Sequence, residues 1–301
     1  MGRLTAIVLG AAAGGGYPQW NCACSVCRLA WDGDGRVVPR SQASLAVSAD
    51  GRQWTLLNAS PDLRQQIAKT PELRPAAGTR GSPIAAVMLT GAEVDQTAGL
   101  LNLRERQPFG LYATDETLSV LAANPIFNVL APDLVARRRA ATGEHIALPG
   151  GGVAELFTVP GKVPLYLEGD DPDTAADTGS NVGIEVTADG TRLVFVPGCA
   201  ALTPALSQRL ARADVVLFDG TLFTDEEMLE SGTGTKTGRR MGHMPIDGAG
   251  GSLSALAGLT VRRIYIHINN TNPILVSGSA PRRTVEAAGW EIAEDGLRIV
   301  L

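Results

Sequence analysis

Three apolar runs of strand length are each followed by side chains that can bind a metal or transfer a proton. The run 86–89 precedes Glu93, Asp95 and Gln96, the run 215–218 precedes Asp219, and the run 264–266 precedes His267. Open α/β folds usually keep their chemistry at the carboxyl ends of strands. The pattern therefore predicts a fold in which several strands deliver functional side chains to one edge of a sheet.

The rest of the chain alternates strand-like and helix-like segments. We expect strands at 4–9, 44–47, 54–58, 86–89, 153–158, 163–167, 182–186, 193–196, 215–218 and 263–267, and helices at 97–104, 117–122, 131–140 and 252–259. Ser60 is the expected N-cap of another helix, with Pro61 at its first position. The glycine-rich segment 10–16 fits the spacing of neither the dinucleotide-binding motif nor the Walker motif, so we interpret it as a close-packed turn.

The same pattern bears on domain organisation. Apolar residues make up 45% of the 301, which is enough for a substantial core, and no Pro/Ser-rich linker divides the chain. We therefore expect a single domain spanning residues 1–301. Because 1–130 and 150–301 each supply a run of strands, we expect two sheets with helices outside them.

Charge and hydropathy exclude several classes of function. The net charge of −5 gives no electrostatic support for binding nucleic acid, and we interpret the basic cluster 137–139 as a solvated helix face. No run reaches the roughly 18 apolar residues of a membrane span. The N-terminus lacks a charged leader followed by a signal-peptide core. We therefore expect a cytoplasmic protein that binds neither nucleic acid nor membranes.

Three of the four cysteines are crowded into Cys22-Ala-Cys24-Ser-Val-Cys27. Such close neighbours make poor disulfide partners, whereas thiolates at this spacing can surround one soft cation, usually zinc. We predict a structural zinc site whose fourth ligand comes from elsewhere in the chain. The alternative is three reduced cysteines in a tight turn. Cys199 stands alone and is expected to be a small core residue.

The residues after the strands have both a functional and a structural interpretation. If Glu93, Asp95, Gln96, Asp219 and His267 converge, they form an oxygen-rich site with one imidazole, which suits iron or manganese better than a closed zinc centre. Taken singly, Asp95 and Asp219 could cap a helix or a turn, and His267 could be a hydrogen-bonded core histidine. The repetition of such residues at strand ends favours the functional interpretation.

Two segments outside the strands also carry polar side chains. The stretch 168–181 is rich in aspartate and predicts an exposed, lid-like loop. A calcium loop is the alternative, although the spacing does not match an EF-hand. The glycine-rich segment 232–244 is expected to be flexible and ends in His243.

The segment Thr90-Gly-Ala-Glu-Val-Asp-Gln-Thr-Ala-Gly99 resembles the T-H-x-H-x-D-H-x-x-G signature of the metallo-β-lactamase superfamily. The strings Gly-Gly-Gly-Tyr-Pro-Gln-Trp-Asn-Cys at 14–22 and His-Ile-Asn-Asn-Thr-Asn-Pro-Ile at 267–274 look like the coenzyme PQQ synthesis protein B family. Asp219-Gly-Thr-Leu and Thr237-Gly-Arg-Arg-Met-Gly-His243 support this resemblance. It implies an αββα sandwich, with two mixed β-sheets and helices on the outer faces.

The chain departs from that superfamily at several metal-ligand positions. Gly91 and Glu93 stand where the first two histidines are expected, and Gln96 replaces a histidine found in other members of the family. The bridging aspartate falls at Gly198. Asp95 and His267 are retained. We therefore expect no two-zinc hydrolase.

The family resemblance implies a step in making pyrroloquinoline quinone (PQQ) from a peptide-derived glutamate–tyrosine unit, by iron- and O2-dependent hydroxylation of the tyrosine ring. An open Fe(II) site would be chemically consistent with this step. We assign Asp95 and His267 as ligands of the active-site metal, with Glu93 or Gln96 completing the set. His243 and Asp219 are the candidate catalytic residues, with His243 acting as acid or base or orienting a phenol. Asn270 or His243 is the candidate fourth ligand of the structural zinc, because zinc-bearing relatives tend to carry a histidine at position 270.

The alternative function is a carrier or transport protein for PQQ or its precursor, on a hydrolase fold without an active-site metal. Loss of ligands at Gly91, Gln96 and Gly198 favours the carrier, and retention of Asp95 and His267 favours the oxygenase. The expected partner is the small-molecule or peptide-derived precursor. A homodimer and contacts with other proteins of the PQQ pathway remain open.

Overall fold

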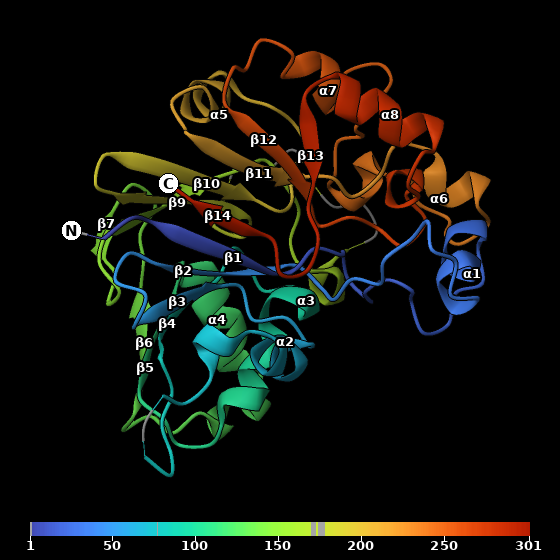
Figure 1. The fold of residues 1–301 in the computed structure, drawn as a ribbon. Helices are drawn as coiled ribbons and strands as arrows, with labels where there is room; N and C mark the ends of the chain where they lie inside the picture. The colour runs from blue at the N-terminus through green and yellow to red at the C-terminus, as the bar shows by residue number, and fades with distance from the viewer. Residues whose placement is uncertain (1, 77, 170–172, 174–177) are drawn as a thin grey trace.

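The computed structural model describes residues 2–76, 78–169, 173 and 178–301. Within these residues, two seven-stranded mixed β-sheets lie face to face, and helices cover their outer faces (Figure 1). The predicted αββα arrangement is confirmed. None of the helices in the described part of the chain has the length and apolar character needed to cross a membrane.

The first sheet comes mainly from the N-terminal half. Its strand order is β14-β1-β2-β3-β4-β5-β6. The pairs β14–β1, β1–β2 and β2–β3 are antiparallel, and β3, β4, β5 and β6 run parallel to one another. Its strands are β1 (Thr5–Gly10), β2 (Ser44–Ser48), β3 (Trp54–Leu57), β4 (Ile84–Met88), β5 (Phe109–Ala113), β6 (Val135–Arg139) and β14 (Arg298–Val300).

The second sheet has the order β13-β12-β11-β10-β9-β8-β7, and β10 to β13 are parallel. Its strands are β7 (His145–Ala147), β8 (Val153–Thr158), β9 (Val182–Ala188), β10 (Thr191–Val196), β11 (Val215–Asp219), β12 (Arg262–Ile266) and β13 (Trp290–Ile292). The carboxyl ends of β10, β11 and β12 therefore lie at one edge of this sheet.

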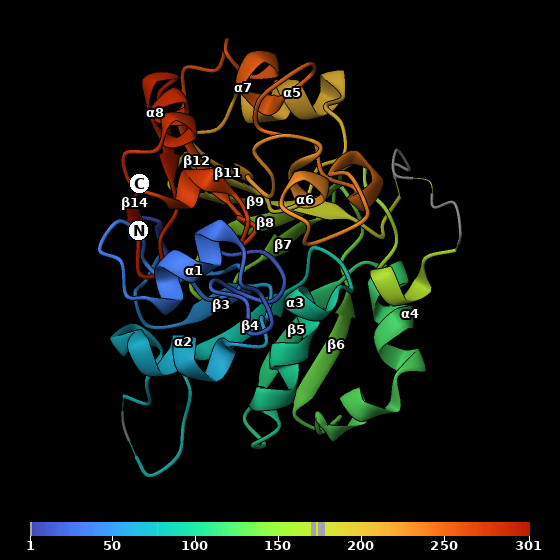
Figure 2. The ribbon, with the colours of Figure 1, turned by 90° about the vertical axis from the view of Figure 1, so that its right-hand side faces the viewer.

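The helices are short and fall into separate groups. Figures 1 and 2 show α2, α3 and α4 on the first sheet, α5, α7 and α8 on the second, and α1 and α6 at one end of the molecule. Their bounds are α1 (Ser25–Trp31), α2 (Leu63–Lys69), α3 (Val94–Thr97), α4 (Asp115–Ala123), α5 (Pro204–Leu210), α6 (Glu227–Glu230), α7 (Ser252–Ala255) and α8 (Ala280–Ala287). The 3-10 helices are Pro71–Leu73, Ala98–Leu103, Pro125–Val129, Leu165–Leu167, Arg239–Met241 and Pro273–Leu275.

The alternation of side chains along each strand produces three apolar layers. Alternate residues such as Val8 and Val47 in the first sheet and Phe195 and Leu217 in the second form the core between the sheets. The opposite faces pack under the helices: Leu56 and Val87 form part of one outer layer, and Val216 and Phe218 form part of the other. Strands buried on both faces explain the continuous apolar runs.

Several sequence predictions differ from the structure. Residues 131–140, predicted to be helical, contain strand β6, because pairing with β5 and burial of Val135 outweigh the helix preference of Ala and Arg. Residues 163–167, predicted as a strand, form the 3-10 helix Leu165–Leu167. Helix α2 begins at Leu63 rather than Pro61, and its N-cap is Asp62 rather than Ser60. The C-terminal strand β14 pairs with β1 in the first sheet, so the C-terminal half contributes one strand to the sheet of the N-terminal half.

The other predicted strands and the helices near 97–104, 117–122 and 252–259 have counterparts in the structure, although the last is only one turn long. Half of the predicted acidic loop 168–181, namely 170–172 and 174–177, lies outside the described residues, and with it the calcium-loop alternative.

Candidate functional site

A cavity of about 460 Å³ opens where strands of the two sheets end together. It lies beyond the carboxyl ends of β4, β11 and β12, and its lining includes Asp95, His243 and His267. Hydrogen bonding joins the sheets at this edge, because Val182 N at the start of β9 donates to Thr90 O after β4. The predicted convergence of strand ends is therefore present, and the volume is that of a small-molecule site.

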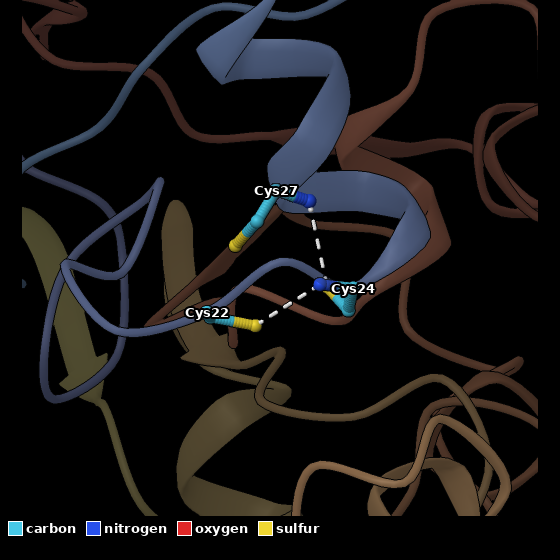
Figure 3. Close-up of side chains that lie close together, drawn as sticks. All are labelled: Cys22, Cys24 and Cys27. Atoms are coloured by element: carbon cyan, nitrogen blue, oxygen red, sulfur yellow. Dashed lines mark hydrogen bonds between the residues drawn. The ribbon is translucent and has the colours of Figure 1, made fainter.

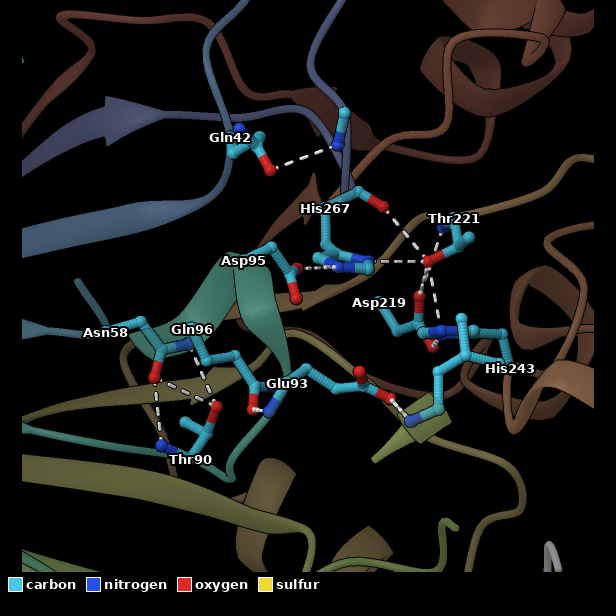
Figure 4. Close-up of polar contacts among 12 residues, drawn as sticks. Gln42, Asn58, Thr90, Glu93, Asp95, Gln96, Asp219, Thr221, His243 and His267 are labelled. Atoms are coloured by element: carbon cyan, nitrogen blue, oxygen red, sulfur yellow. Dashed lines mark hydrogen bonds and ion pairs between the residues drawn. The ribbon is translucent and has the colours of Figure 1, made fainter. Parts of the chain in front are cut away.

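Asp95 and His267 meet inside this cavity although 172 residues separate them in the chain. His267 Nε2 lies 2.9 Å from Asp95 Oδ2 (Figure 4). His267 follows β12 with a backbone φ of +57°, a left-handed conformation that few residues other than glycine adopt. This conformation brings the ring back over the strand end, so that it faces α3 on the opposite sheet.

Asp219 and His243 form a second carboxylate–imidazole pair beside the first. His243 Nδ1 lies 2.7 Å from Asp219 Oδ2, and the two imidazole rings stack with centroids 5.3 Å apart. Asp219 is fully buried, and Oδ2 also accepts from Cys199 N at 2.8 Å. The donor atoms of Asp219, His243 and His267 all lie within 4.8 Å of one another.

The hydroxyl of Thr221 connects the two pairs (Figure 4). Thr221 Oγ1 donates to Asp219 Oδ1 at 2.6 Å and lies 2.8 Å from His267 Nδ1 and 3.1 Å from His243 Nδ1. Since its single proton goes to the carboxylate, the hydroxyl accepts a hydrogen bond from His267 Nδ1–H. Nε2–H of the same ring donates to Asp95, so His267 is doubly protonated in this arrangement.

The titration behaviour of the buried groups agrees with these bonds. Burial lowers the pKa of His267, but the Asp95 carboxylate outweighs it and holds the pKa above its usual value. Burial raises the pKa values of Asp95 and Asp219, but the imidazole partners outweigh it and hold both below their usual range. Two carboxylates and two imidazoles thus lie close together. Carboxylates and neutral imidazoles suit a divalent cation, so a metal bound by His267 would displace a proton from the ring.

The structure directs Glu93 and Gln96 away from His267. Gln96 Oε1 accepts from Glu93 N at 3.1 Å, in the geometry of a helix cap at the start of α3. A Cβ at Gly91 would lie 2.7 Å from this same Gln96 oxygen. Glu93 Oε1 binds Lys162 Nζ at 3.3 Å and Leu165 N at 3.0 Å. The geometry therefore favours Asp219, rather than Glu93 or Gln96, as the group that completes a donor set with Asp95 and His267.

Cys22, Cys24 and Cys27 converge at the start of α1, with their Sγ atoms within 4.8 Å of one another (Figure 3). Asn270 lies against them, with Nδ2 3.2 Å from Cys22 Sγ and 3.3 Å from Cys27 Sγ. Three thiols that face each other without forming a disulfide fit zinc. Of the two candidate fourth ligands, the structure brings Asn270 to the thiols, and His243 lies in the other site.

Sequence reasoning missed several residues that line the cavity. Thr221 follows Asp219 by two residues, and this proximity was the available signal. Lys162, Glu168 and Lys236 also line the cavity. Lys162 and Glu168 flank the strand wrongly predicted at 163–167, and Lys236 lies on a loop far away in sequence, so no local pattern indicated that they would meet. Cys199 is fully buried, as expected for a core residue, and burial raises its pKa well above its usual value.

Comparisons with known proteins agree with this architecture. A family model described as a beta-lactamase superfamily domain matches residues 53–268. The chain is 56% identical over 299 residues to the coenzyme PQQ synthesis protein B of Methylobacterium sp. (strain 4-46), covering 99% of this chain and 100% of that protein. The corresponding protein of Rhizobium meliloti (strain 1021) is 53% identical over 299 residues, covering 99% and 98%.

Solved structures show the same relationship in three dimensions. The Zn²⁺-bound PqqB from Methylobacterium extorquens, 52% identical, superposes with a TM-score of 0.97 and covers 99% of this chain and 100% of that one. A diphosphatase of the PhnP family, 20% identical, has a TM-score of 0.71 with coverages of 99% and 97%. At that identity the second likeness concerns the fold alone.

Proposed function

The chain belongs to the coenzyme PQQ synthesis protein B family of the beta-lactamase superfamily, and from this premise we propose that it acts in PQQ biosynthesis. Its proposed activity is iron- and O2-dependent hydroxylation of the tyrosine ring of a peptide-derived glutamate–tyrosine precursor. One oxygen atom enters a ring C–H bond, the other leaves as water, and an external two-electron donor is consumed.

The observation that carries this proposal is the position of His267 between two carboxylate groups. It contacts Asp95 on one side and, through Thr221, the Asp219–His243 pair on the other. Asp95, Asp219 and His267 would hold the metal, and His243 beside them would transfer the proton. A bound Fe(II) with vacant coordination positions would supply the dioxygen chemistry.

The chain's own residues supply proton transfer and orientation. Since Asp219 accepts from His243 Nδ1–H, this bond fixes the tautomer and leaves Nε2 as the proton-accepting atom of a ring that lines the cavity. We propose that Nε2 accepts the proton of the phenol of the bound precursor. Asp219 acts through His243 by stabilising the imidazolium that results.

The structural zinc at Cys22, Cys24 and Cys27 belongs to the same proposal. Its support is the donor set with Asn270 and the Zn²⁺-bound relative. Asn270 lies three residues after His267, so a metal at the thiols would brace the loop that carries the active-site imidazole.

Metal analysis and mass spectrometry test the hydroxylation. Protein loaded with Fe(II) without oxygen should bind one iron in addition to one zinc. Addition of ¹⁸O2, ascorbate and a synthetic glutamate–tyrosine unit should then label the product with one oxygen atom. His267→Ala should lose both iron and labelling, whereas a variant of the exposed pair Arg106–Asp133 should keep both.

No iron uptake beyond the structural zinc, or stoichiometric iron with no labelled product, would count against the oxygenase. Wild-type labelling by Asp95→Ala and His267→Ala proteins would instead refute the assignment of these residues as metal ligands. Tight binding of the precursor without conversion would instead support the carrier function. One observation favours it: Gln96 caps a helix, so its oxygen is not directed at a metal.

A further inference from the structure

One wall of the active-site cavity carries four side chains of alternating charge. Glu93 Oε1 lies 3.3 Å from Lys162 Nζ, and Lys162 Nζ lies 2.7 Å from Glu168 Oε1. Lys236 Nζ continues the series at 2.7 Å from Glu168 Oε2. All four residues line the same cavity as the two imidazoles. We call Glu93, Lys162, Glu168 and Lys236 the charged wall.

The charged wall is held in place before any ligand arrives. Leu165 N donates to Glu93 Oε1 at 3.0 Å, and the Tyr166 hydroxyl donates to Ala92 O at 2.5 Å. These two bonds fasten the 3-10 helix Leu165–Leu167, between Lys162 and Glu168, to the turn that carries Glu93 and Asp95. Charges held in fixed positions need little reorganisation to bind a charged ligand.

The wall has access to the cavity yet is largely removed from solvent. The side chains of Lys162 and Glu168 are 11% and 5% exposed, whereas Glu93 and Lys236 are about one third exposed. For Glu168 the two ammonium groups outweigh burial and hold the pKa below its usual value. Ion pairs in such surroundings are screened less than pairs on the surface.

The charges that line the cavity indicate what kind of ligand fits. Glu168 is paired on several sides, by Lys162, Lys236 and the guanidinium of Arg240 at 3.7 Å. Glu93 and the two lysines therefore present opposite charges to a ligand, and a purely anionic or purely cationic ligand would face a like charge. A zwitterion offers an ammonium to Glu93 and a carboxylate to Lys162 or Lys236. The Glu93 carboxylate lies two residues from Asp95, so such a head group would bind beside the imidazoles.

We propose that the charged wall binds the α-amino-acid head group, ammonium and carboxylate together, of the molecule whose ring faces His243 and His267. This proposal rests on the proposed function, because it names the substrate class of the same cavity. Lys162 is the central residue, since its ammonium contacts both carboxylates of the wall. Glu93 and Lys162 thereby become specificity-determining residues.

Binding measurements with three related probes test the wall without requiring turnover. L-phenylalanine carries both charged groups, phenethylamine carries only the ammonium, and 3-phenylpropionate carries only the carboxylate. Isothermal titration calorimetry on the zinc-containing protein should show L-phenylalanine binding about tenfold or more tighter than either other probe, the effect of one added charge-assisted hydrogen bond.

Matched variants assign the effect to particular residues. Lys162→Met should remove most of the advantage of L-phenylalanine over phenethylamine, and Lys162→Arg should keep most of it. Glu93→Gln should remove most of the advantage over 3-phenylpropionate. Arg106→Met, at an exposed ion pair outside the cavity, should behave as wild type. Far-UV circular dichroism and zinc content verify that each variant is folded.

The proposal is overturned if the wild-type protein binds the three probes with affinities within about threefold of one another. It is equally overturned if Lys162→Met and Glu93→Gln retain the tenfold preferences. Loss of hydroxylation with these preferences intact would refute the proposed function alone. Hydroxylation without the preferences would refute the charged wall alone.

Discussion

At the scale of single residues, the Thr221 hydroxyl links the two carboxylate–imidazole pairs of the site. It contacts Asp219, His243 and His267, and it also lies 3.0 Å from His267 O. Replacement by valine preserves the shape but leaves a buried Asp219 oxygen and His267 Nδ1 without this partner. We expect Thr221→Val to lower the free energy of unfolding of the metal-free protein by roughly 1–3 kcal/mol.

Urea denaturation followed by circular dichroism measures this loss, and Thr221→Ser is the matched control. Serine keeps the hydroxyl and gives up only a methyl group, so its stability should lie close to that of the wild type. If valine and serine cost the same, the hydroxyl contributes nothing beyond packing, and the coupling of the two histidines through Thr221 is wrong.

Glu227 provides a residue-scale prediction about pH. Its carboxylate is 7% exposed and accepts from Phe223 N and Thr271 Oγ1, and burial raises its pKa to about 7. In the unfolded chain the group loses its proton near its ordinary pKa of about 4.3. Between these values the native state holds more protons than the unfolded state, so stability falls as pH rises from about 4.3 to about 7.

The neutral variant Glu227→Gln removes this proton uptake while keeping an acceptor for Phe223 N. We expect it to be more stable than the wild type at pH 8, by an amount on the order of 3 kcal/mol, and equal to it near pH 4. Urea unfolding at several pH values measures the difference. A difference that does not change with pH would contradict the raised pKa.

At the scale of elements, one of the two edge strands of the first sheet is β6, which carries three consecutive arginines. Arg137 donates to Phe127 O, Arg138 lies over the Tyr112 ring, and Arg139 pairs with Asp115. Charged side chains on an edge strand oppose its pairing with the edge of another molecule. The cluster interpreted from sequence as a helix face thus lies on a strand with a different physical role.

This interpretation predicts how the strand responds to substitution. Replacing all three arginines by threonine should leave the far-UV spectrum unchanged but promote association, because threonine favours strands and carries no charge. Light scattering across a concentration series should show larger species for this variant. The triple lysine variant keeps the charge and should remain at the wild-type size; association of both variants alike would show that charge is not the cause.

The elements also show how far the sequence determines the fold. Strands such as β4, β11 and β12 were predictable because burial on both faces produces continuous apolar runs. Strand β6 was not, because its alanines and arginines favour a helix and only pairing with β5 decides otherwise. The segment 163–167 has a strand-like composition, yet bonds to Ala92 and Glu93 on the other sheet hold it as a 3-10 helix.

The candidate site divides in the same way. The meeting of Asp95 and His267 followed from strand ends and the family pattern. The second pair, Asp219–His243, required the position of a long loop, and the charged wall required loops that no local pattern brings together. Gln96 illustrates the limit: an amide in a ligand position is indistinguishable in sequence from the helix cap that the structure contains.

At the scale of the whole molecule, the cysteine cluster joins segments from opposite ends of the chain. Cys22, Cys24 and Cys27 lie near the N-terminus, whereas Asn270 belongs to the loop after β12 that also carries His267. A zinc ion there would close a loop of more than two hundred residues. Its removal should therefore affect both global stability and the active-site loop.

Cys27→Ser should abolish zinc binding and lower the melting temperature by an amount on the order of 10 °C, since a ligand a thousandfold above its Kd contributes about 4 kcal/mol. Atomic absorption and differential scanning calorimetry measure the two effects. Cys199→Ser is the matched control, because Cys199 lies outside the cluster and should leave zinc content unchanged.

Thiol titration supplies an independent readout: chelation should expose Cys22 and Cys24 to reagent, while buried Cys199 stays unreactive. A Cys27→Ser protein that keeps one zinc per chain and the wild-type melting temperature would show that these thiols do not hold the metal.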